Sequence, residues 1–325
     1  MISTESAPAV PLASLDHLWF QVAGTLCNLT CQHCFIHCSP KNDSFGFLTL
    51  DQVRRQLDAS IPLGVKEYYF TGGEPFLNRD MVDILILTLD YGPATVLTNG
   101  TVFKEAWLSR LAEAAAASRY SLEFRVSIDG FSPQTNDPIR GPGTFDRAMR
   151  GVEQLVRHRF LPIITAARTW PDGEEQEVIA RFTQMLREAG YGRPRLKILP
   201  TLHLGAEEER SRGYHDAERV TEAMLDTYDT TQLICEHSRI VTDRGIYVCP
   251  ILIESDDAHL GDQLADALGP YALKHGACFT CYQYGAICSN ASSRPETRRS
   301  EKGHTARTEP PACASECQDE GPEHA

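Results

Sequence analysis

The chain has 325 residues, of which 42% are hydrophobic and 23% are charged. This composition is typical of a globular protein, and it excludes a disordered, collagen-like or coiled-coil chain. The formal net charge of -13 argues against nucleic acid or an anionic membrane as a partner, and it favours a neutral or cationic ligand. The sequence contains no apolar run of about 18 residues and no signal-peptide pattern, so we expect a cytoplasmic protein. Its eleven cysteines then indicate metal or cluster ligation rather than disulfides.

Short β-branched or aromatic runs alternate with amphipathic stretches through the first two thirds of the chain. This alternation predicts parallel strands joined by helices, curled into a partial (β/α)6 barrel of the TIM type. The working face of such a barrel is the carboxyl edge of its strands. The predicted strands are residues 17–22, 67–70, 94–97, 122–128, 162–166 and 195–199. The predicted helices are residues 49–61, 79–90, 104–116, 145–158 and 174–189.

Three regions follow one another along the chain. We expect the barrel over residues 15–205, a cysteine-rich extension over 206–288 and a disordered tail over 289–325, because the tail has no large apolar residue. Cys313 and Cys317 lie in that tail and are assigned no role, since nothing near them can orient a thiolate.

The extension begins where the strand–helix alternation stops. Residues 207–212 look like an exposed linker or a helix start, and residues 213–232 predict one helix. A hairpin is predicted next, with strands at 239–242 and 246–248.

The strongest motif is a CxxxCxxC directly after the first strand, formed by Cys27, Cys31 and Cys34. Three thiolates suit a [4Fe–4S] cluster that leaves one iron open to an exogenous ligand, whereas a structural zinc site takes four closed ligands. Cys38 could supply a fourth ligand for a zinc or electron-transfer site, so its role stays open.

This motif resembles the signature of the radical S-adenosylmethionine (SAM) superfamily, and motifs at the next three strand ends agree. They are a GGEP element at 72–75, a TNG element at 98–100 and an SxDG element at 127–130, the last followed by Arg140. The resemblance implies that the Gly-rich backbone and Glu74 hold the methionine amino group, and that the SxDG region contacts the ribose and carboxylate. The implied cofactor-binding residues are Gly72, Gly73, Glu74, Asn99, Ser127, Asp129, Arg140 and His33. His33 would pack towards adenine, and the alternative for it is an exposed loop histidine.

The activity implied by the resemblance is reductive cleavage of SAM to a 5′-deoxyadenosyl radical, which abstracts hydrogen from an unactivated C–H bond. It also implies an electron donor of the flavodoxin or ferredoxin type.

Five further cysteines lie in the extension, and their spacing resembles the SPASM or twitch regions of radical SAM enzymes. One auxiliary [4Fe–4S] cluster needs four ligands, which leaves one thiol over, either a functional thiol or a buried inert one. The sequence around Cys249 departs from the family pattern, because the hairpin glycine is shifted by one residue and the proline follows the cysteine. We therefore expect Cys249 to be a free catalytic thiol. The expected ligands are Cys235, Cys278, Cys281 and Cys288.

A free thiol at this place favours an epimerase, since a thiol can return hydrogen to the face opposite the adenosyl radical. The chain resembles radical SAM epimerases of aminoglycoside antibiotic biosynthesis, which implies a cationic small-molecule substrate. Carboxylates that could pair with its ammonium groups, if they are not simply solvated, are Glu236, Glu254, Asp256 and Asp257. The alternatives are a radical SAM dehydrogenase of an aminocyclitol, a sulfatase-maturase-like peptide-modifying enzyme, and a non-catalytic iron–sulfur or zinc scaffold.

Overall fold

The structure of the protein is a computed structural model that describes residues 7–285 and 287–290. Cys313, Cys317 and the rest of the predicted tail from residue 291 onward lie outside the described residues. Within the described part, no helix is both long and apolar enough to cross a lipid bilayer.

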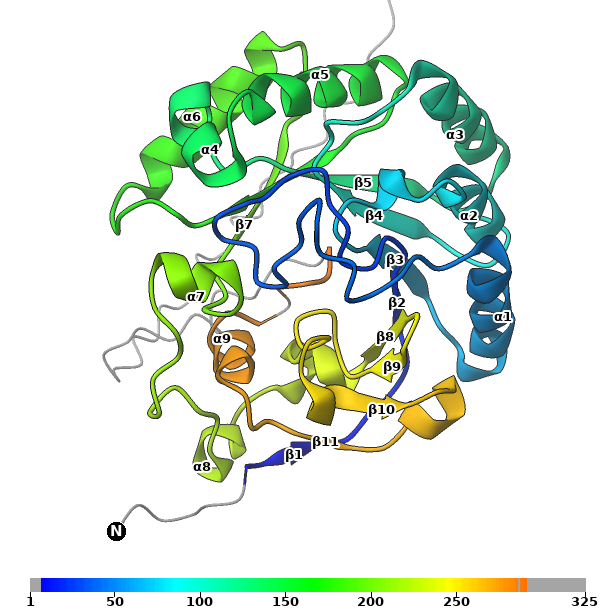
Figure 1. Cartoon of the computed structure of the whole chain (residues 1–325), viewed down its shortest axis with the longest axis vertical. Coiled ribbons are helices and arrows are strands. Elements are labelled where there is room, and N and C mark those ends of the chain that lie inside the picture. Colours follow the sequence, from blue (N-terminus) through cyan, green and yellow to red (C-terminus); the bar gives the residue numbers. More distant parts are fainter. Residues whose placement is uncertain (1–6, 286, 291–325) are drawn as a thin grey trace, which may run out of the picture.

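A curved sheet of nine strands in the order β10-β9-β8-β2-β3-β4-β5-β6-β7 forms the body of the molecule (Figure 1). Six of these strands pair in parallel in chain order, as expected for a partial barrel. They are β2 (His17–Gln21), β3 (Glu67–Thr71), β4 (Ala94–Thr98), β5 (Leu122–Ser127), β6 (Ile163–Ala167) and β7 (Arg195–Leu199). Each lies within two residues of its predicted bounds, so the predicted fold class is confirmed.

Helices cover the outside of this sheet (Figure 1). They are α1 (Leu50–Ser60), α2 (Met81–Thr88), α3 (Glu105–Ala117), α4 (Pro133–Arg140), α5 (Thr144–Arg157) and α6 (Glu175–Glu188). The start of α1 shows why these boundaries are sharp: the Thr49 side chain accepts the Gln52 backbone N–H, and the Gln52 side chain accepts the Thr49 N–H.

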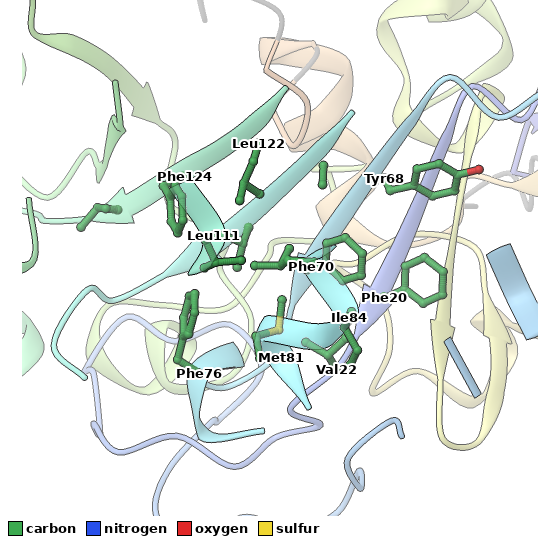
Figure 2. Packing of buried hydrophobic residues seen from close by; sticks show 14 of the residues in the cluster. Phe20, Val22, Tyr68, Phe70, Phe76, Met81, Ile84, Leu111, Leu122 and Phe124 are labelled. Carbon is green, nitrogen blue, oxygen red and sulfur yellow. The ribbon is translucent and has the colours of Figure 1, made fainter. Parts of the chain in front are cut away.

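The main core lies between the strands and the covering helices (Figure 2). Alternate strand residues point outwards to it, and the rings of Phe20 and Phe70 from neighbouring strands stack with centroids 5.3 Å apart. Met81 and Ile84 of α2 close over them, and both are fully buried. The other strand face is therefore turned inwards, and its side chains line the barrel interior.

The extension continues the barrel sheet rather than forming a separate body. Strand β8 (Ser238–Thr242) pairs in parallel with β2, and β9 (Gly245–Tyr247) and β10 (His259–Gly261) follow in antiparallel order. A second small sheet joins β1 (Ala9–Val10) to β11 (Tyr271–Ala272). The remaining α-helices are α7 (Ala206–Arg210), α8 (Glu222–Leu225) and α9 (Gly276–Tyr284). Short 3₁₀ turns occupy Ile61–Leu63, Pro75–Leu77, Thr230–Gln232, Ile234–Glu236, Asp256–Ala258 and Leu264–Ala267.

The prediction of one helix over residues 213–232 is wrong, because that segment contains only the single turn of α8 and one 3₁₀ turn. Its chain is held in turns by side chains instead. The Glu218 carboxylate accepts two hydrogen bonds from Arg212, at 2.7 and 2.8 Å, and one from the His215 backbone N–H. The Tyr214 hydroxyl lies 2.6 Å from that of Thr280, which ties the segment to α9.

Two further differences concern the ends of elements. Helix α4 was not predicted. It contains Pro133 and Pro138, and the first of these occupies the start of the helix, where its missing N–H costs nothing. At the other end of the chain, Ser289 is buried and Asn290 is half-buried, so the packed chain extends two residues into the region predicted as tail.

Candidate active site

The CxxxCxxC motif lies in the loop after β2 and faces a cavity of about 240 Å³ at the carboxyl ends of the strands. Cys27, Cys31 and Cys34 all line this cavity. It also brings together six of the eight predicted cofactor-binding residues, namely Gly72, Gly73, Asn99, Ser127, Arg140 and His33. The strand-end motifs therefore meet at one place, as expected of a barrel active site.

Hydrogen-bond donors lie beside two of the three sulfur atoms. The Cys27 Sγ accepts the Leu29 backbone N–H at 3.4 Å, and the Asn99 side-chain amide lies 3.8 Å from it. The Cys34 Sγ accepts the Cys38 backbone N–H at 3.3 Å. Such donors orient a thiolate ligand and tune the potential of the cluster it holds.

The protonation of these thiols depends on burial and on Cys38. Burial raises the pKa of Cys27 to about 12 and that of Cys31 to about 11. A hydrogen bond from the Cys38 side chain, opposed by burial, lowers the pKa of Cys34. Cys38 thus lies beside Cys34 as a donor to its sulfur, and it lines the same cavity.

The donor set fits a cluster better than a single ion. Among the described residues, no three His, Cys, Asp or Glu side chains converge closely enough to hold one metal ion. A [4Fe–4S] cube presents its irons at separate corners, so its cysteines need not converge on one point. Four thiols line the cavity, those of the CxxxCxxC motif and that of Cys38, and the three of the motif suit that arrangement.

The glycine-rich loop after β3 packs directly on the cysteine loop. The Gly73 N–H donates to the Gly24 carbonyl at 2.9 Å, and the Glu74 N–H donates to the Leu26 carbonyl at 3.0 Å. A Cβ atom at Gly73 would lie 2.0 Å from the Leu26 oxygen, so only glycine fits there. The two motifs therefore depend on each other for their conformation.

Glu74 lies behind the cavity wall, with none of its surface exposed. Its carboxylate accepts the Asn99 N–H at 2.7 Å, the Thr98 hydroxyl at 2.7 Å and the Phe76 N–H at 3.1 Å. Burial raises the pKa of Glu74 to about 7, although these three donors oppose the shift. In this arrangement Glu74 joins the GGEP loop to the TNG loop.

The SxDG motif supplies a buried ion-pair network. Asp129 Oδ2 lies 2.5 Å from Arg140 Nε and 2.7 Å from His33 Nε2, and Asp129 Oδ1 accepts the Ala167 N–H at 2.7 Å. Burial alone would raise the pKa of Asp129, but Arg140 and then His33 outweigh it and hold that pKa well below its ordinary value. Asp129 therefore fixes the side chains of Arg140 and His33 at the cavity wall.

His33 lines the cavity and is neither exposed nor fully paired. Its Nδ1 is buried and has no hydrogen-bond partner among the described residues. A buried polar atom of this kind needs a partner, and a ligand in the cavity can supply one. His33 is thus placed to touch a bound cofactor, and the alternative of an exposed loop histidine has no support here.

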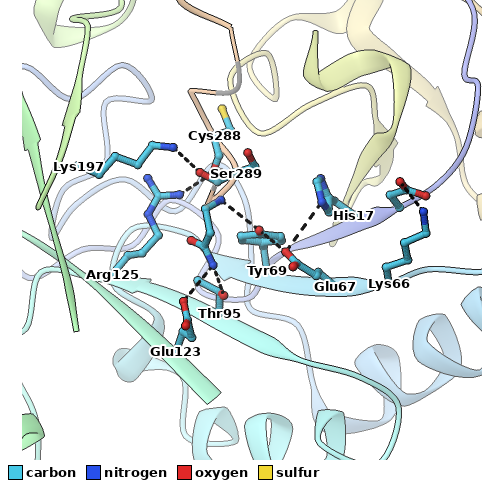
Figure 3. A network of polar contacts seen from close by, with 12 residues as sticks. His17, Lys66, Glu67, Tyr69, Thr95, Glu123, Arg125, Lys197, Cys288 and Ser289 are labelled. Atoms are coloured by element: carbon cyan, nitrogen blue, oxygen red, sulfur yellow. Dashed lines mark hydrogen bonds and ion pairs between the residues drawn. The ribbon is translucent and has the colours of Figure 1, made fainter. Parts of the chain in front are cut away.

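One residue of the cavity floor was missed by the sequence analysis. Arg125 on β5 is only 1% exposed and lines the cavity from inside the barrel. Its Nη1 donates to the Cys288 carbonyl at 2.5 Å (Figure 3). Its Nε lies 3.4 Å from the Thr165 hydroxyl. The sequence could have indicated this position. Side chains alternate between the two faces of a strand, and Arg125 is two residues before Ser127, so both point to the same face.

The extension gathers four of its five cysteines around a second, apolar cavity. Cys235, Cys249, Cys278 and Cys281 line it together, with walls of side chains such as those of Val248 and Leu252. Cys278 and Cys281 lie one turn apart on α9. Cys288 is not among the lining residues of this cavity, although its thiol interacts electrostatically with those of Cys249 and Cys281. The sequence analysis expected Cys249 to be a free thiol. It lies instead beside three of the four cysteines that were expected to bind the auxiliary cluster.

Electrostatics support an anionic group in that cavity. Burial raises the pKa of Cys249 to about 11 and that of Cys278 to about 12, because it disfavours the charged thiolates. Arg239 of β8 is fully buried nearby and donates to the carbonyls of Cys235, Ser238, Ala267 and Gly269. Burial lowers the pKa of Arg239 to about 10, and the Cys235 and Cys249 sulfurs oppose that shift. A cluster with four thiolate ligands would supply the negative charge that this buried cation lacks.

None of the four carboxylates expected to pair with a cationic substrate lines the cavity of about 240 Å³ that holds the CxxxCxxC cysteines, called the SAM-motif cavity below. Glu254 lies 3.8 Å from His37, and Asp257 lies 2.6 Å from Lys274. Glu236 is buried beside the second cysteine group, and Asp256 is exposed.

Comparison with known proteins agrees with the motifs. The profile described as Radical SAM superfamily matches residues 22–186, which is half of the chain.

Curated relatives share this region only in part. The AdoMet-dependent heme synthase of Methanosarcina barkeri is 36% identical over 144 residues, which cover 44% of this chain and 39% of that protein. The GTP 3′,8-cyclase of Mannheimia succiniciproducens is 30% identical over 193 residues, covering 58% of this chain and 55% of the cyclase. The subtilosin biosynthesis protein AlbA of Bacillus subtilis is 28% identical over 134 residues, covering 41% of this chain and 29% of AlbA. The chain therefore matches between about a third and a half of the length of these relatives.

Solved structures share the fold. SuiB of Streptococcus suis bound to S-adenosylmethionine has a TM-score of 0.58 at 17% identity, over 76% of this chain and 63% of SuiB. Native anSMEcpe with bound AdoMet and the Kp18Cys peptide also has a TM-score of 0.58 at 17% identity, over 77% of this chain and 79% of that one.

Proposed function

Because the chain belongs to the radical SAM superfamily, we propose that it cleaves S-adenosylmethionine at a [4Fe–4S] cluster and removes hydrogen from a small molecule bound in the barrel. The observation that carries the proposal is the single cavity lined by Cys27, Cys31 and Cys34 together with His33 and Arg140. When bound, the cluster and SAM supply a 5′-deoxyadenosyl radical able to break an unactivated C–H bond.

The side chains of this protein would hold the cluster and SAM in place. Cys27, Cys31 and Cys34 would hold the cluster, with Cys38 donating to the Cys34 sulfur. Arg140, a fixed cation, would pair with the carboxylate of SAM, and His33 Nδ1 would give the cofactor a hydrogen-bond partner.

We further propose a second cluster held by Cys235, Cys249, Cys278 and Cys281, since these four line one cavity beside a buried arginine. This choice replaces Cys288 by Cys249 in the ligand set expected from the sequence. Cys288 becomes the thiol left over, and its carbonyl bonds to Arg125 at the floor of the SAM-motif cavity.

The narrower candidate is an epimerase, and the thiol left over favours it. In that reaction the substrate carbon radical takes a hydrogen atom from a cysteine S–H, which forms a C–H bond and leaves a thiyl radical. An electron, supplied by a flavodoxin or ferredoxin through the auxiliary cluster, and a proton would restore the thiol. An aminoglycoside such as neomycin C, converted to neomycin B, is the substrate that the sequence resemblance suggests. Overall acidity supports it, but the placement of the four carboxylates does not.

The first experiment tests the general proposal. Anaerobically reconstituted protein should contain iron and sulfide for two [4Fe–4S] clusters and, with a strong reductant, should convert SAM to 5′-deoxyadenosine. Replacing Cys27, Cys31 and Cys34 by alanine should abolish this conversion and leave iron for one cluster. Wild-type protein that binds iron but forms no 5′-deoxyadenosine would contradict the proposal.

A second experiment tests the epimerase candidate. Turnover of neomycin C in deuterated water should give an isomer that carries one deuterium, since an exchangeable thiol delivers solvent deuterium to carbon. Cys288→Ala should keep iron for both clusters but lose this product, whereas Cys249→Ala should lose the auxiliary iron. The opposite pattern would identify Cys249 as the donor, and an unchanged sugar would remove the aminoglycoside from consideration.

A further inference from the structure

Arg125 is a buried cation whose charge is not balanced by a carboxylate. Within the described residues, its hydrogen bonds go to a backbone carbonyl and a hydroxyl, both of which are neutral. The ionisable groups that favour its charge are the Cys288 thiol and the Tyr69 hydroxyl, and burial, the largest influence, lowers the pKa of Arg125. A buried charge without a counter-charge is costly, which makes this position a ready partner for an anion.

A second cation strengthens the positive field at the same depth of the barrel. Lys197 of β7 donates to the Ser289 carbonyl at 2.5 Å, and it approaches this segment from the same side as Arg125 (Figure 3). Burial and then the charge of Arg125 lower the pKa of Lys197 to about 8. The two side chains are thus close enough to repel each other.

The acidic groups around the cavity do not neutralise the positive charges of Arg125 and Lys197. Asp129 is already matched by Arg140 and His33. Glu74 lies behind the wall and points its oxygens to three donors of its own. Glu123 is engaged by Arg195 at 3.3 Å and by Asn290. A molecule entering the barrel beside the cofactor therefore meets an unmatched positive charge at the floor.

The guanidinium also has donor capacity to spare. Within residues 7–285 and 287–290, only its Nη1 and Nε make hydrogen bonds, and the two N–H groups of Nη2 make none. Arg125 lines the cavity, and so does Thr165, whose hydroxyl lies beside its Nε. A planar guanidinium beside a hydroxyl is suited to a carboxylate or phosphate oxygen.

We propose that Arg125 and Thr165 form an anion-binding subsite at the floor of the active-site cavity, which holds a carboxylate or phosphate group of the substrate. The proposal rests on the proposed radical SAM function and names the substrate class that the function leaves open. It selects anionic small molecules over the polycationic sugar suggested by sequence resemblance.

The test uses reconstituted holoenzyme with SAM and a reductant. The probe is a small-molecule extract of cells grown in deuterated medium, separated on ion exchangers into anionic, cationic and unretained fractions. Deuterium that appears in 5′-deoxyadenosine reports abstraction from a molecule of that fraction. We expect it from the anionic fraction. Phosphatase treatment before separation distinguishes the two sources, because a phosphate ester then leaves the anionic fraction and a carboxylate stays in it.

Three variants separate anion binding from a structural role. Arg125→Gln should reduce deuterium transfer at least about tenfold, as for loss of a charge-assisted hydrogen bond, and Arg125→Lys should restore part of it. Asn290→Ala is the matched control, because Asn290 anchors the same segment to Tyr69, Thr95 and Glu123 without carrying charge. It should transfer deuterium as the wild type does.

The outcomes are distinct. Transfer from the cationic or unretained fraction of the untreated extract, no transfer from any fraction, or wild-type transfer by Arg125→Gln would each overturn the subsite. Equal losses in Arg125→Gln and Asn290→Ala would also overturn it, since Arg125 would then act only by holding the segment. Formation of 5′-deoxyadenosine without any extract reports the proposed function separately, so its absence marks a failure of that function instead.

Discussion

At the scale of single residues, Asp129 shows how one carboxylate organises a binding wall. It is fully buried and contacts Arg140 and His33 on one oxygen and the Ala167 N–H on the other. We predict that Asp129→Asn destabilises the protein by about 3–5 kcal/mol at neutral pH, because Arg140 is left without its counter-charge. Chemical denaturation of the two proteins measures the difference.

The pH dependence of that difference follows from the sign of the pKa shift. The Asp129 pKa is lowered in the folded state from an ordinary value of 3.8, so its contribution is complete above 3.8. As the pH falls below that value towards the lower native pKa, the contribution is lost and the gap between wild type and variant should shrink. Asp172→Asn is the control, because Asp172 pairs with Arg168 on an exposed loop and should change stability far less. If the difference in unfolding free energy between wild type and Asp129→Asn grew as the pH fell, the role given to the Asp129 carboxylate would be contradicted.

At the scale of elements, the cysteine loop and the glycine-rich loop behave as one unit. Gly73→Ala would push a methyl group against the Leu26 oxygen, 2.0 Å from the ideal Cβ position, and separate the loops. We predict that this variant folds but retains much less iron at the first site after reconstitution. Gly192→Ala is the control, since no atom lies within 4 Å of its Cβ position. Wild-type iron content in the Gly73 variant would show that the loops are not coupled.

Strand ends were predictable from sequence because a strand buried on both faces reads as a short apolar run with a motif at its carboxyl end. The failures occurred where tertiary contacts override local pattern. Residues 213–232 have helical spacing, but the Arg212–Glu218 pair and the Tyr214–Thr280 contact hold them in turns. Arg125 was overlooked because a charge within a strand suggests an exposed face until the strand is known to line a barrel.

The ligand set of the second site was only partly predictable. The five cysteines were found from their spacing, yet spacing could not decide which four converge. That depends on how β9 and α9 pack, which places Cys249 with Cys235, Cys278 and Cys281. The cavity therefore supports our proposal of Cys249 as a ligand, whereas the shifted glycine before it favoured a free thiol.

At the scale of the whole molecule, two neighbouring strands connect the two cysteine sites. Strand β2 leads into the CxxxCxxC loop, and β8, paired beside it with Leu18 opposite Arg239, lies between Cys235 and Cys249 in the chain. Each site has a buried arginine in or beside it that no carboxylate neutralises, Arg125 at the first and Arg239 at the second. The fold thus places positive charge inside its sheet at both points where we propose that anionic groups bind.

This charge should set the potential of the auxiliary cluster. Removing a buried positive charge favours the oxidised, less negative cluster, so Arg239→Gln should lower its reduction potential by more than about 59 mV, a tenfold change for a one-electron couple. The measurement is a redox titration followed by EPR, made in a background where Cys27, Cys31 and Cys34 are alanine so that only the auxiliary cluster is present. Arg244→Gln is the control, because Arg244 lies on the same hairpin but is exposed. Equal potentials in the Arg239 variant and its parent would mean that the cluster lies too far from Arg239 to be the anion that balances it.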